Sequence, residues 1–206
     1  MRSRPAVIVL AAGRGARFGG ASHKLAQGLD GSTVLGTTLR HVIATQLPCV
    51  VVTTQALADI ARRSVAARDV TVLPEVGTPG AVPLGMGSSI AAGVSARANA
   101  GGWLILPGDM PLVQASTLLA VARQLEHHPV VCAHYKGHRG HPVGFAAELY
   151  SELAMLADDE GARRLVARYP ALALELDDPG VLVDVDTEAD LEQVRQTLSA
   201  TPMALR

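Results

Sequence analysis

The sequence predicts an α/β fold, in which a doubly wound and mostly parallel sheet lies between two layers of helices. The apolar run at residues 7–10 is too short for a helix and rich in β-branched residues, which is typical of a strand buried on both faces. Similar short runs alternate with longer amphipathic stretches, which indicates right-handed βαβ units. Hydrophobic residues make up 49% of the 206 positions and charged residues 18%, enough for one sizeable core.

The elements follow one another without a linker or an internal repeat. Strands are expected at residues 7–10, 50–53, 70–73, 102–106, 130–133, 173–176 and 181–183. Helices are expected at about residues 33–45, 57–67, 88–98, 116–127 and 188–200. A hairpin turn at residues 136–138 is expected to lead into a strand at the edge of the sheet. We expect a single domain over residues 1–206, with loose ends at residues 1–5 and 201–206.

The composition argues against several classes of partner. A net charge of -1 leaves no electrostatic footprint for nucleic acid, and 3% aromatic residues leave few platforms for stacked bases. No apolar run approaches the length of a membrane span. Cys49 and Cys132 lie far apart in apolar, strand-like segments, so we expect buried free thiols and a reducing, cytoplasmic setting.

A loop of small residues follows the first expected strand, at residues 11–20. Small side chains let a ligand approach the backbone, and Gly13 and Gly15 can adopt conformations that turn amide groups inward. Arg17 and Lys24 add two positive charges near the same loop. A buried strand that leads into such a loop is suited to hold a polyphosphate.

Two common glycine-rich motifs fit this loop poorly. A dinucleotide fingerprint requires G-x-G-x-x-G, but the third glycine, Gly19, comes one residue late, and no carboxylate follows the strand at residues 50–53. A P-loop requires G-K-[ST], whereas Lys24 stands between His23 and Leu25. A glycine-rich surface turn without a ligand remains an alternative.

Aspartates follow two further apolar runs. Asp109 comes just after the strand at residues 102–106, at the end where open α/β sheets bind ligands, although it could also cap the next turn. Asp184 and Asp186 are two residues apart, so an extended backbone points both to one side. Thr187 and Asp190 after them form a capping box for the last helix. Carboxylate oxygens of this kind suit Mg²⁺.

A long loop rich in glycine and proline is expected at residues 74–87, and such loops are often functional. It leads into a helix that starts near Gly87 and Ser88, whose amide groups can meet a nucleotide. The plainer alternative is that Ser88 or Ser89 only caps this helix.

These segments together resemble the nucleotidyltransferases of the GT-A-like superfamily, and within it the molybdenum cofactor cytidylyltransferase family. The signature L-A-A-G-x-x-x-R-x-G, followed by K-L, matches the stretch that starts with Leu10, Ala11, Ala12 and Gly13, although four residues separate Gly19 from Lys24 where the family usually has fewer. Later matches are G-M-G-S-S at residues 85–89, P-G-D-M-P at 107–111, G-H-P-V-x-F at 140–145 and D-x-D-T-x-x-D-L at 184–191.

The resemblance implies a Rossmann-like fold and the Mg²⁺-dependent transfer of CMP from CTP to the phosphate of molybdenum–molybdopterin, with release of pyrophosphate. A client molybdoenzyme would receive the product. The implied nucleotide-binding residues are Leu10, Ala11, Ala12, Gly13, Gly15, Arg17, Lys24, Gly87, Ser88 and Gly108. The implied catalytic residues are Arg17, Lys24 and Asp109; the metal ligands are Asp109 and Asp186, with Asp184 as a weaker candidate.

The second substrate is implied to bind at His141 and Pro142, although His141 could equally fix its own turn. The sequence shows no activated nucleophile, and none is needed, because a phosphate monoester is already largely anionic at neutral pH. Two rivals stay open. A guanylyltransferase or another small-molecule nucleotidyltransferase would share these sites, but guanylyltransferase relatives carry L-A-G-G where this chain has Ala12. A cofactor-binding chaperone without catalysis would not need two metal carboxylates.

Overall fold

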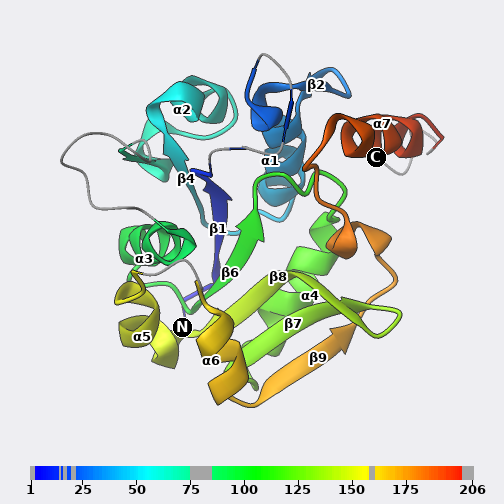
Figure 1. The fold of residues 1–206 in the computed structure, drawn as a ribbon. Coiled ribbons are helices and arrows are strands. Elements are labelled where there is room, and N and C mark those ends of the chain that lie inside the picture. The colour runs from blue at the N-terminus through cyan, green and yellow to red at the C-terminus, as the bar shows by residue number, and fades with distance from the viewer. Residues whose placement is uncertain are drawn as a thin grey trace.

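The computed structural model describes residues 3–13, 15, 18–19, 22–74, 85–157 and 161–200 (Figure 1). The strands are β1 (Ala6–Ala11), β2 (Gly28–Leu29), β3 (Ser32–Thr33), β4 (Cys49–Thr54), β5 (Val70–Leu73), β6 (Gly102–Pro107), β7 (Val130–Tyr135), β8 (His138–Ala146) and β9 (Ala171–Glu175). The α-helices are α1 (Val34–Ala44), α2 (Gln55–Arg62), α3 (Met86–Ala96), α4 (Ala115–Gln124), α5 (Tyr150–Ala154), α6 (Arg163–Arg168) and α7 (Glu188–Ala200). Short 3₁₀ turns are η1 (Lys24–Ala26), η2 (Ala67–Asp69), η3 (Ala147–Leu149) and η4 (Pro179–Leu182).

The central sheet has seven strands in the order β5-β4-β1-β6-β8-β7-β9. Neighbouring strands run parallel except around β8, which is antiparallel to both β6 and β7. In β1, Val9 pairs with Val51 of β4 on one side and with Leu106 of β6 on the other. The prediction of a mostly parallel α/β sheet is confirmed.

The two faces of the sheet carry separate apolar cores, because successive residues of a strand point to opposite sides. Val7 and Val9 of β1 belong to the core formed with α1, α2, α4 and α7. Ile8, between them, belongs to the core formed with α3, α5 and α6. Figure 1 shows these two groups of helices on either side of the sheet. The structure therefore has the predicted three layers.

Some predicted helices and strands match the structure in their bounds, and others differ from it. The strand at residues 70–73 and the last helix lie where they are expected, but the helix expected at residues 57–67 already ends at Arg62. The alternative that Ser88 or Ser89 only caps α3 is wrong: Gly85 is the N-cap, and no side chain accepts a hydrogen bond there. Residues 75–84 of the expected loop and the expected tail at residues 201–206 lie outside the described part of the chain.

The prediction of an edge strand after the hairpin is wrong. Strand β8 lies between β6 and β7, and Val143 and Phe145 on it are buried. Gly144 lets α4 approach the strand, since a Cβ there would lie 2.9 Å from Val121 Cγ1. The polar residues at the start of β8 led to the wrong prediction. They belong to the part of this strand that pairs with β7 but not with β6.

The strand expected at residues 181–183 is instead the 3₁₀ turn η4, and the side chain of Asp178 explains why. This buried carboxylate accepts hydrogen bonds from the backbone of Gly180 at 2.9 Å and of Gln114 at 3.0 Å, and from the hydroxyl of Thr117 at 2.6 Å. It bends the chain into a turn and ties that turn to the start of α4. The local apolar run at residues 181–183 gives no sign of these long-range partners.

Both cysteines lie in strands, as expected: Cys132 is buried and Cys49 half-buried, and both are free thiols. Burial raises the pKa of each thiol, which lowers its reactivity. Among the described residues, no helix is both long enough and apolar enough to cross a membrane.

We expect Asp178→Ala to lower the free energy of unfolding by about 3 kcal/mol, because three donors lose a partner they cannot replace with water. Urea denaturation followed by circular dichroism measures the change. Asp177→Ala is the matched control, since that side chain is exposed and next in sequence. Equal losses in the two variants would contradict the role of Asp178.

Candidate active site

A cleft of about 780 Å³ opens at the carboxyl ends of β1 and β6. These strands are parallel neighbours, so the loops that follow them meet at one edge of the sheet. The opposite wall of the cleft comes from the start of β8, the turn η4 and the segment that precedes α7. Residues at the start of α3 and α6 complete its rim.

Asp109 is held at the end of β6 by contacts of the residue before it. The amide of Gly108 donates to the carbonyl of Leu10 at 2.8 Å, and the hydroxyl of Thr38 donates to the carbonyl of Gly108 at 2.9 Å. A Cβ on Gly108 would lie 3.0 Å from that carbonyl oxygen of Leu10 and 3.1 Å from Leu35 Cδ1. Glycine is therefore needed to bring the Asp109 loop against β1.

Asp184 and Asp186, from the C-terminal part of the chain, line the same cleft as Asp109. The amide of Val185 donates to the carbonyl of Asp109 at 2.9 Å, and the side chain of Val185 is fully buried. The two flanking aspartates therefore turn the other way, into the cleft. Their predicted convergence is confirmed, although the segment that carries them is not part of a sheet.

The predicted capping box at the start of α7 is also present and steadies this segment. The amide of Thr187 donates to Asp190 Oδ2 at 2.7 Å, and the amide of Asp190 donates to the Thr187 hydroxyl at 3.2 Å. The same Oδ2 accepts from the amide of Asp186 at 3.1 Å. The Thr187 hydroxyl also donates to this Oδ2, at 2.8 Å. That hydrogen bond above all, together with those from the two amides to the carboxylate, lowers the pKa of Asp190, so it remains ionised at neutral pH.

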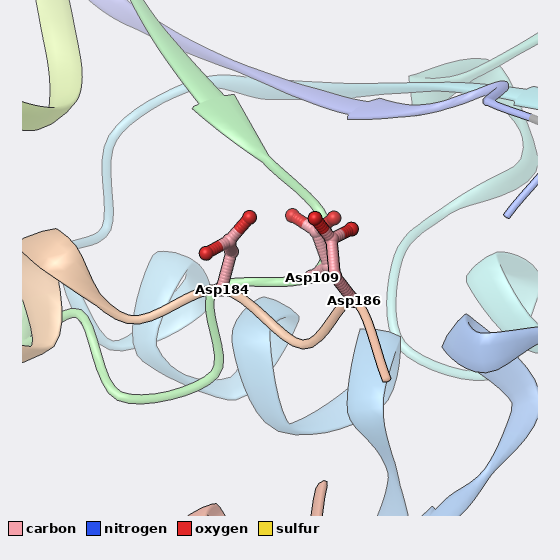
Figure 2. A group of neighbouring side chains, drawn as sticks. All are labelled: Asp109, Asp184 and Asp186. Carbon is pink, nitrogen blue, oxygen red and sulfur yellow. The ribbon is translucent and has the colours of Figure 1, made fainter. Parts of the chain in front are cut away.

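Three carboxylates form the centre of the cleft, and Figure 2 shows them on the same side of the two segments that carry them. One oxygen each from Asp109, Asp184 and Asp186 lies within 4.8 Å of the others. Burial raises the pKa of Asp184, and the negative charges of Asp186 and Asp109 raise it further. Asp109 Oδ1 is buried without a hydrogen-bond partner among the described residues. Crowded oxygen ligands with an unsatisfied acceptor fit a hard divalent cation such as Mg²⁺ or Mn²⁺.

Lys24 bridges two of these carboxylates. Its Nζ donates to Asp109 Oδ2 and to Asp186 Oδ1, both at 2.6 Å, and only 12% of its side chain is exposed. Burial alone would lower the pKa of this ammonium, but the charges and hydrogen bonds of the two aspartates outweigh burial and raise it. Lys24 is therefore a fixed positive charge inside an acidic cluster.

The glycine-rich loop forms the adjacent wall. Leu10, Ala12, Gly13 and Gly15 line the cleft beside Lys24, as expected of residues that contact a nucleotide. Arg17 lies outside the described residues. His23, which the sequence analysis did not select, also lines the cleft.

Several of the predicted site residues do not line the cleft. Ala11 is buried in the core and Gly87 within α3, while Gly108 and Pro142 support the backbone of Asp109 and His141. None of these four is among the cleft-lining residues, and neither is Ser88, whose hydroxyl donates to the carbonyl of Ala157 at 3.4 Å. The neighbouring Ser89 lines the cleft in its place.

The far side of the cleft contains His141 with two arginines, Arg139 and Arg163, that sequence reasoning did not select. Burial lowers the pKa of His141, against the opposing effects of the Ile105 backbone and the Asp109 charge, so the ring is neutral at pH 7. Its Nδ1 is buried with no hydrogen-bond partner among the described residues. The arginines come from separate elements, β8 and the start of α6, and only the fold brings them together.

Comparison with known proteins places this arrangement in a family. Residues 7–173 match the model of the MobA-like NTP transferase domain. The chain belongs to this family. It is a nucleotidyltransferase, and the match extends along the chain from β1 into β9. A search of curated proteins found no match.

Solved structures share the same fold over nearly the whole chain. Rv0371c from Mycobacterium tuberculosis is 27% identical with a TM-score of 0.79, covering 95% of this chain and 99% of that one. Rv0371c has also been solved in complex with manganese, and that structure has 25% identity, a TM-score of 0.74 and coverage of 95% and 100%. Molybdopterin-guanine dinucleotide biosynthesis protein A from Archaeoglobus fulgidus, at 17% identity, a TM-score of 0.70 and coverage of 95% and 100%, is similar in fold.

The position of Lys24 leads to a prediction with two opposite effects. Lys24→Met removes a charge that competes with a divalent cation, so without nucleotide we expect Mn²⁺ to bind roughly tenfold more tightly. The same variant should bind a nucleoside triphosphate more weakly, because a phosphate group loses its partner. Electron paramagnetic resonance of free Mn²⁺ and calorimetric titration with nucleotide measure the two changes.

Lys136→Met is the matched control for this experiment. Lys136 is the only other lysine of the chain and lies exposed in the turn between β7 and β8. It should change neither affinity. Unchanged or weaker Mn²⁺ binding in Lys24→Met would show that the lysine does not compete for the carboxylates.

Proposed function

We propose that the protein transfers CMP from CTP to the phosphate of molybdenum–molybdopterin and releases pyrophosphate, with Mg²⁺ as its metal. The observation that carries this proposal is the acidic cluster of Asp109, Asp184 and Asp186, bridged by Lys24, beside a glycine-rich loop at the end of β1. A site of this kind suits a reaction in which two anionic groups must be brought together and their charge neutralised.

Asp109 and Asp186 would hold the metal, with Asp184 as a third ligand. The crowded oxygens and the unpartnered Asp109 Oδ1 support this assignment, and so does the manganese complex of Rv0371c. A bound Mg²⁺ would supply Lewis-acid stabilisation of the triphosphate. The remaining work falls to side chains and backbone groups of the chain.

In the proposed reaction a phosphate oxygen of the acceptor forms a bond to the α-phosphorus of CTP. The bond from that phosphorus to the β-phosphate oxygen breaks, and its electron pair leaves with pyrophosphate. Lys24 and Arg17 would stabilise the charge on the phosphates, and the backbone at Gly13 and Gly15 would contact them. No side chain needs to act as a nucleophile, because the acceptor phosphate is already anionic.

The acceptor would bind on the side of His141. The neutral ring has a buried nitrogen without a described partner, and Arg139 and Arg163 on the rim can pair with anionic groups. Pro142 would position the histidine and not touch the substrate itself. The product would then pass to a client molybdoenzyme, and the two free thiols support a reducing compartment such as the cytoplasm.

The second candidate is the corresponding transfer of GMP. The match to a MobA-like domain and the fold shared with a molybdopterin-guanine dinucleotide protein favour it. Ala12 favours CTP: it lines the cleft, and its methyl group occupies space that glycine would leave for a larger base. We therefore retain CTP as the proposed donor.

The experiment that tests the proposal is incubation of the protein with molybdenum cofactor, Mg²⁺ and each of the four nucleoside triphosphates in turn. We expect a cytosine dinucleotide product by mass spectrometry and one pyrophosphate per product with CTP. Product with GTP alone would replace the proposal by the second candidate. Absence of a product with every triphosphate would refute both.

Asp109→Asn is the catalytic variant for the same assay. It keeps the size of the side chain but removes a charge from the proposed metal site, so we expect turnover to fall by more than about a hundredfold. Thermal unfolding should change little, because the carboxylate contributes little to the core. Asp59→Asn, on the exposed face of α2, is the control and should be as active as the wild type. Near wild-type turnover of Asp109→Asn at saturating Mg²⁺ would refute the assignment.

Ala12→Gly tests the choice of base. One methyl group in a pocket is worth about 1–3 kcal/mol, or roughly 10- to 200-fold in selectivity. We expect the variant to relax the preference for CTP over GTP without inverting it. Competition between the two nucleotides, measured as a ratio of kcat/KM, gives the result. An unchanged ratio would show that the base is selected elsewhere in the cleft.

A further inference from the structure

His23 connects two segments of the cleft through both nitrogens of its ring. Nε2 lies 2.8 Å from the carbonyl oxygen of Gly13, ten residues earlier, and Nδ1 accepts a hydrogen bond from the amide of Leu25 at 3.1 Å. A backbone amide can only donate, so Nδ1 carries no proton in this arrangement. Nε2 must then carry the proton and donate it to the Gly13 carbonyl. The two contacts together require one neutral tautomer.

The ring also packs against Gly15. This residue has φ of +61°, in the left-handed region that favours glycine, and a Cβ on it would lie 3.3 Å from His23 Nε2. The carbonyl of Gly15 accepts from the amide of Phe18 at 3.0 Å, and the carbonyl of His23 accepts from the amide of Ala26 at 2.9 Å. The histidine thus lies between Gly15 and the turn η1, and each of these takes part in a backbone hydrogen bond of its own.

Each of the two segments that His23 connects presents a group that the proposed function requires. Gly13 and Gly15 line the cleft on one side of the ring, and Lys24, the next residue after His23, reaches the carboxylates of Asp109 and Asp186. A flexible connection between them would have to be ordered each time a nucleotide binds. That ordering costs free energy and weakens binding.

We propose that His23 is a positioning residue that clamps the glycine-rich loop to the turn carrying Lys24, so that both are in place before the nucleoside triphosphate arrives. The proposal rests on the proposed function, because it assigns the clamp to the nucleotide side of that site. His23 does not touch the reacting atoms in this role. It acts through the Gly13 carbonyl and the Leu25 amide.

Two substitutions separate the two hydrogen bonds. In His23→Asn the side-chain oxygen can take the place of Nδ1 and accept from the Leu25 amide, but the side chain is too short to reach Gly13. In His23→Gln the side-chain nitrogen can take the place of Nε2 and donate to the Gly13 carbonyl. His127→Asn is the matched control, since His127 is exposed after the end of α4.

We expect His23→Asn to raise both the Kd for Mg²⁺-bound CTP and its KM by roughly tenfold, with kcat and the thermal unfolding midpoint close to wild type. His23→Gln should recover most of the affinity, and His127→Asn should match the wild type. A fall in kcat without a change in KM, or equal losses in Asn and Gln variants, would overturn the clamp.

Nuclear magnetic resonance gives a readout that does not depend on activity. Long-range proton–nitrogen correlation of the free wild-type protein should show His23 with a protonated Nε2 and an unprotonated Nδ1. The opposite tautomer would overturn the proposal. If the wild type binds CTP and His23→Asn binds it equally well, only the clamp fails. If the wild type binds no nucleoside triphosphate, the proposed function fails, and the clamp with it.

Discussion

The site depends on one electrostatic constraint: three carboxylates are held within reach of one another, and a buried ammonium offsets their charge. Lys24 bonds to Asp109, which lies 85 residues later in the sequence, and to Asp186, which lies 162 residues later. Like charges at this distance repel strongly where water is partly excluded. The protein can hold them because the end of β6, paired with β1, fixes the backbone at Asp109, and the amide of Val185 ties the segment of Asp184 and Asp186 to that backbone.

The support for this cluster lies in backbone contacts more than in side chains. Val185 donates to the Asp109 carbonyl, Gly108 donates to Leu10, and Asp190 accepts from the backbone of Asp186. Because these contacts hold the segments in place, the three carboxylates are not needed to stabilise the core. A carboxylate that does not hold the fold together can change its partner from Lys24 to a cation or a substrate at small cost in stability.

Sequence reasoning was most successful where the pattern is local. Runs such as residues 70–73 identified strands by length and β-branched residues, and Asp109, which lies in the cleft, was found by its place after the predicted strand at residues 102–106. It failed where a residue far away in the sequence determines the local structure. The run at residues 181–183 is a 3₁₀ turn because Asp178 binds Gln114 and Thr117. His23 was passed over because its main partner, the Gly13 carbonyl, is a backbone group that no residue type reveals.

The two sides of the cleft are built from different kinds of residue, and this bears on how the site can vary. The side proposed to bind the nucleotide uses backbone groups and charges tied to β1 and β6, where any shift would disturb the carboxylates. The other side uses Arg139 and Arg163, with the exposed side chains of Met86 and Leu182, all on the rim. Among the described residues, no hydrogen bond or ion pair joins these four side chains to the acidic cluster, so they can be exchanged without moving it. Under the proposed function, discrimination between acceptors can therefore change by substitution at the rim, while the charge arrangement that the transfer needs stays fixed.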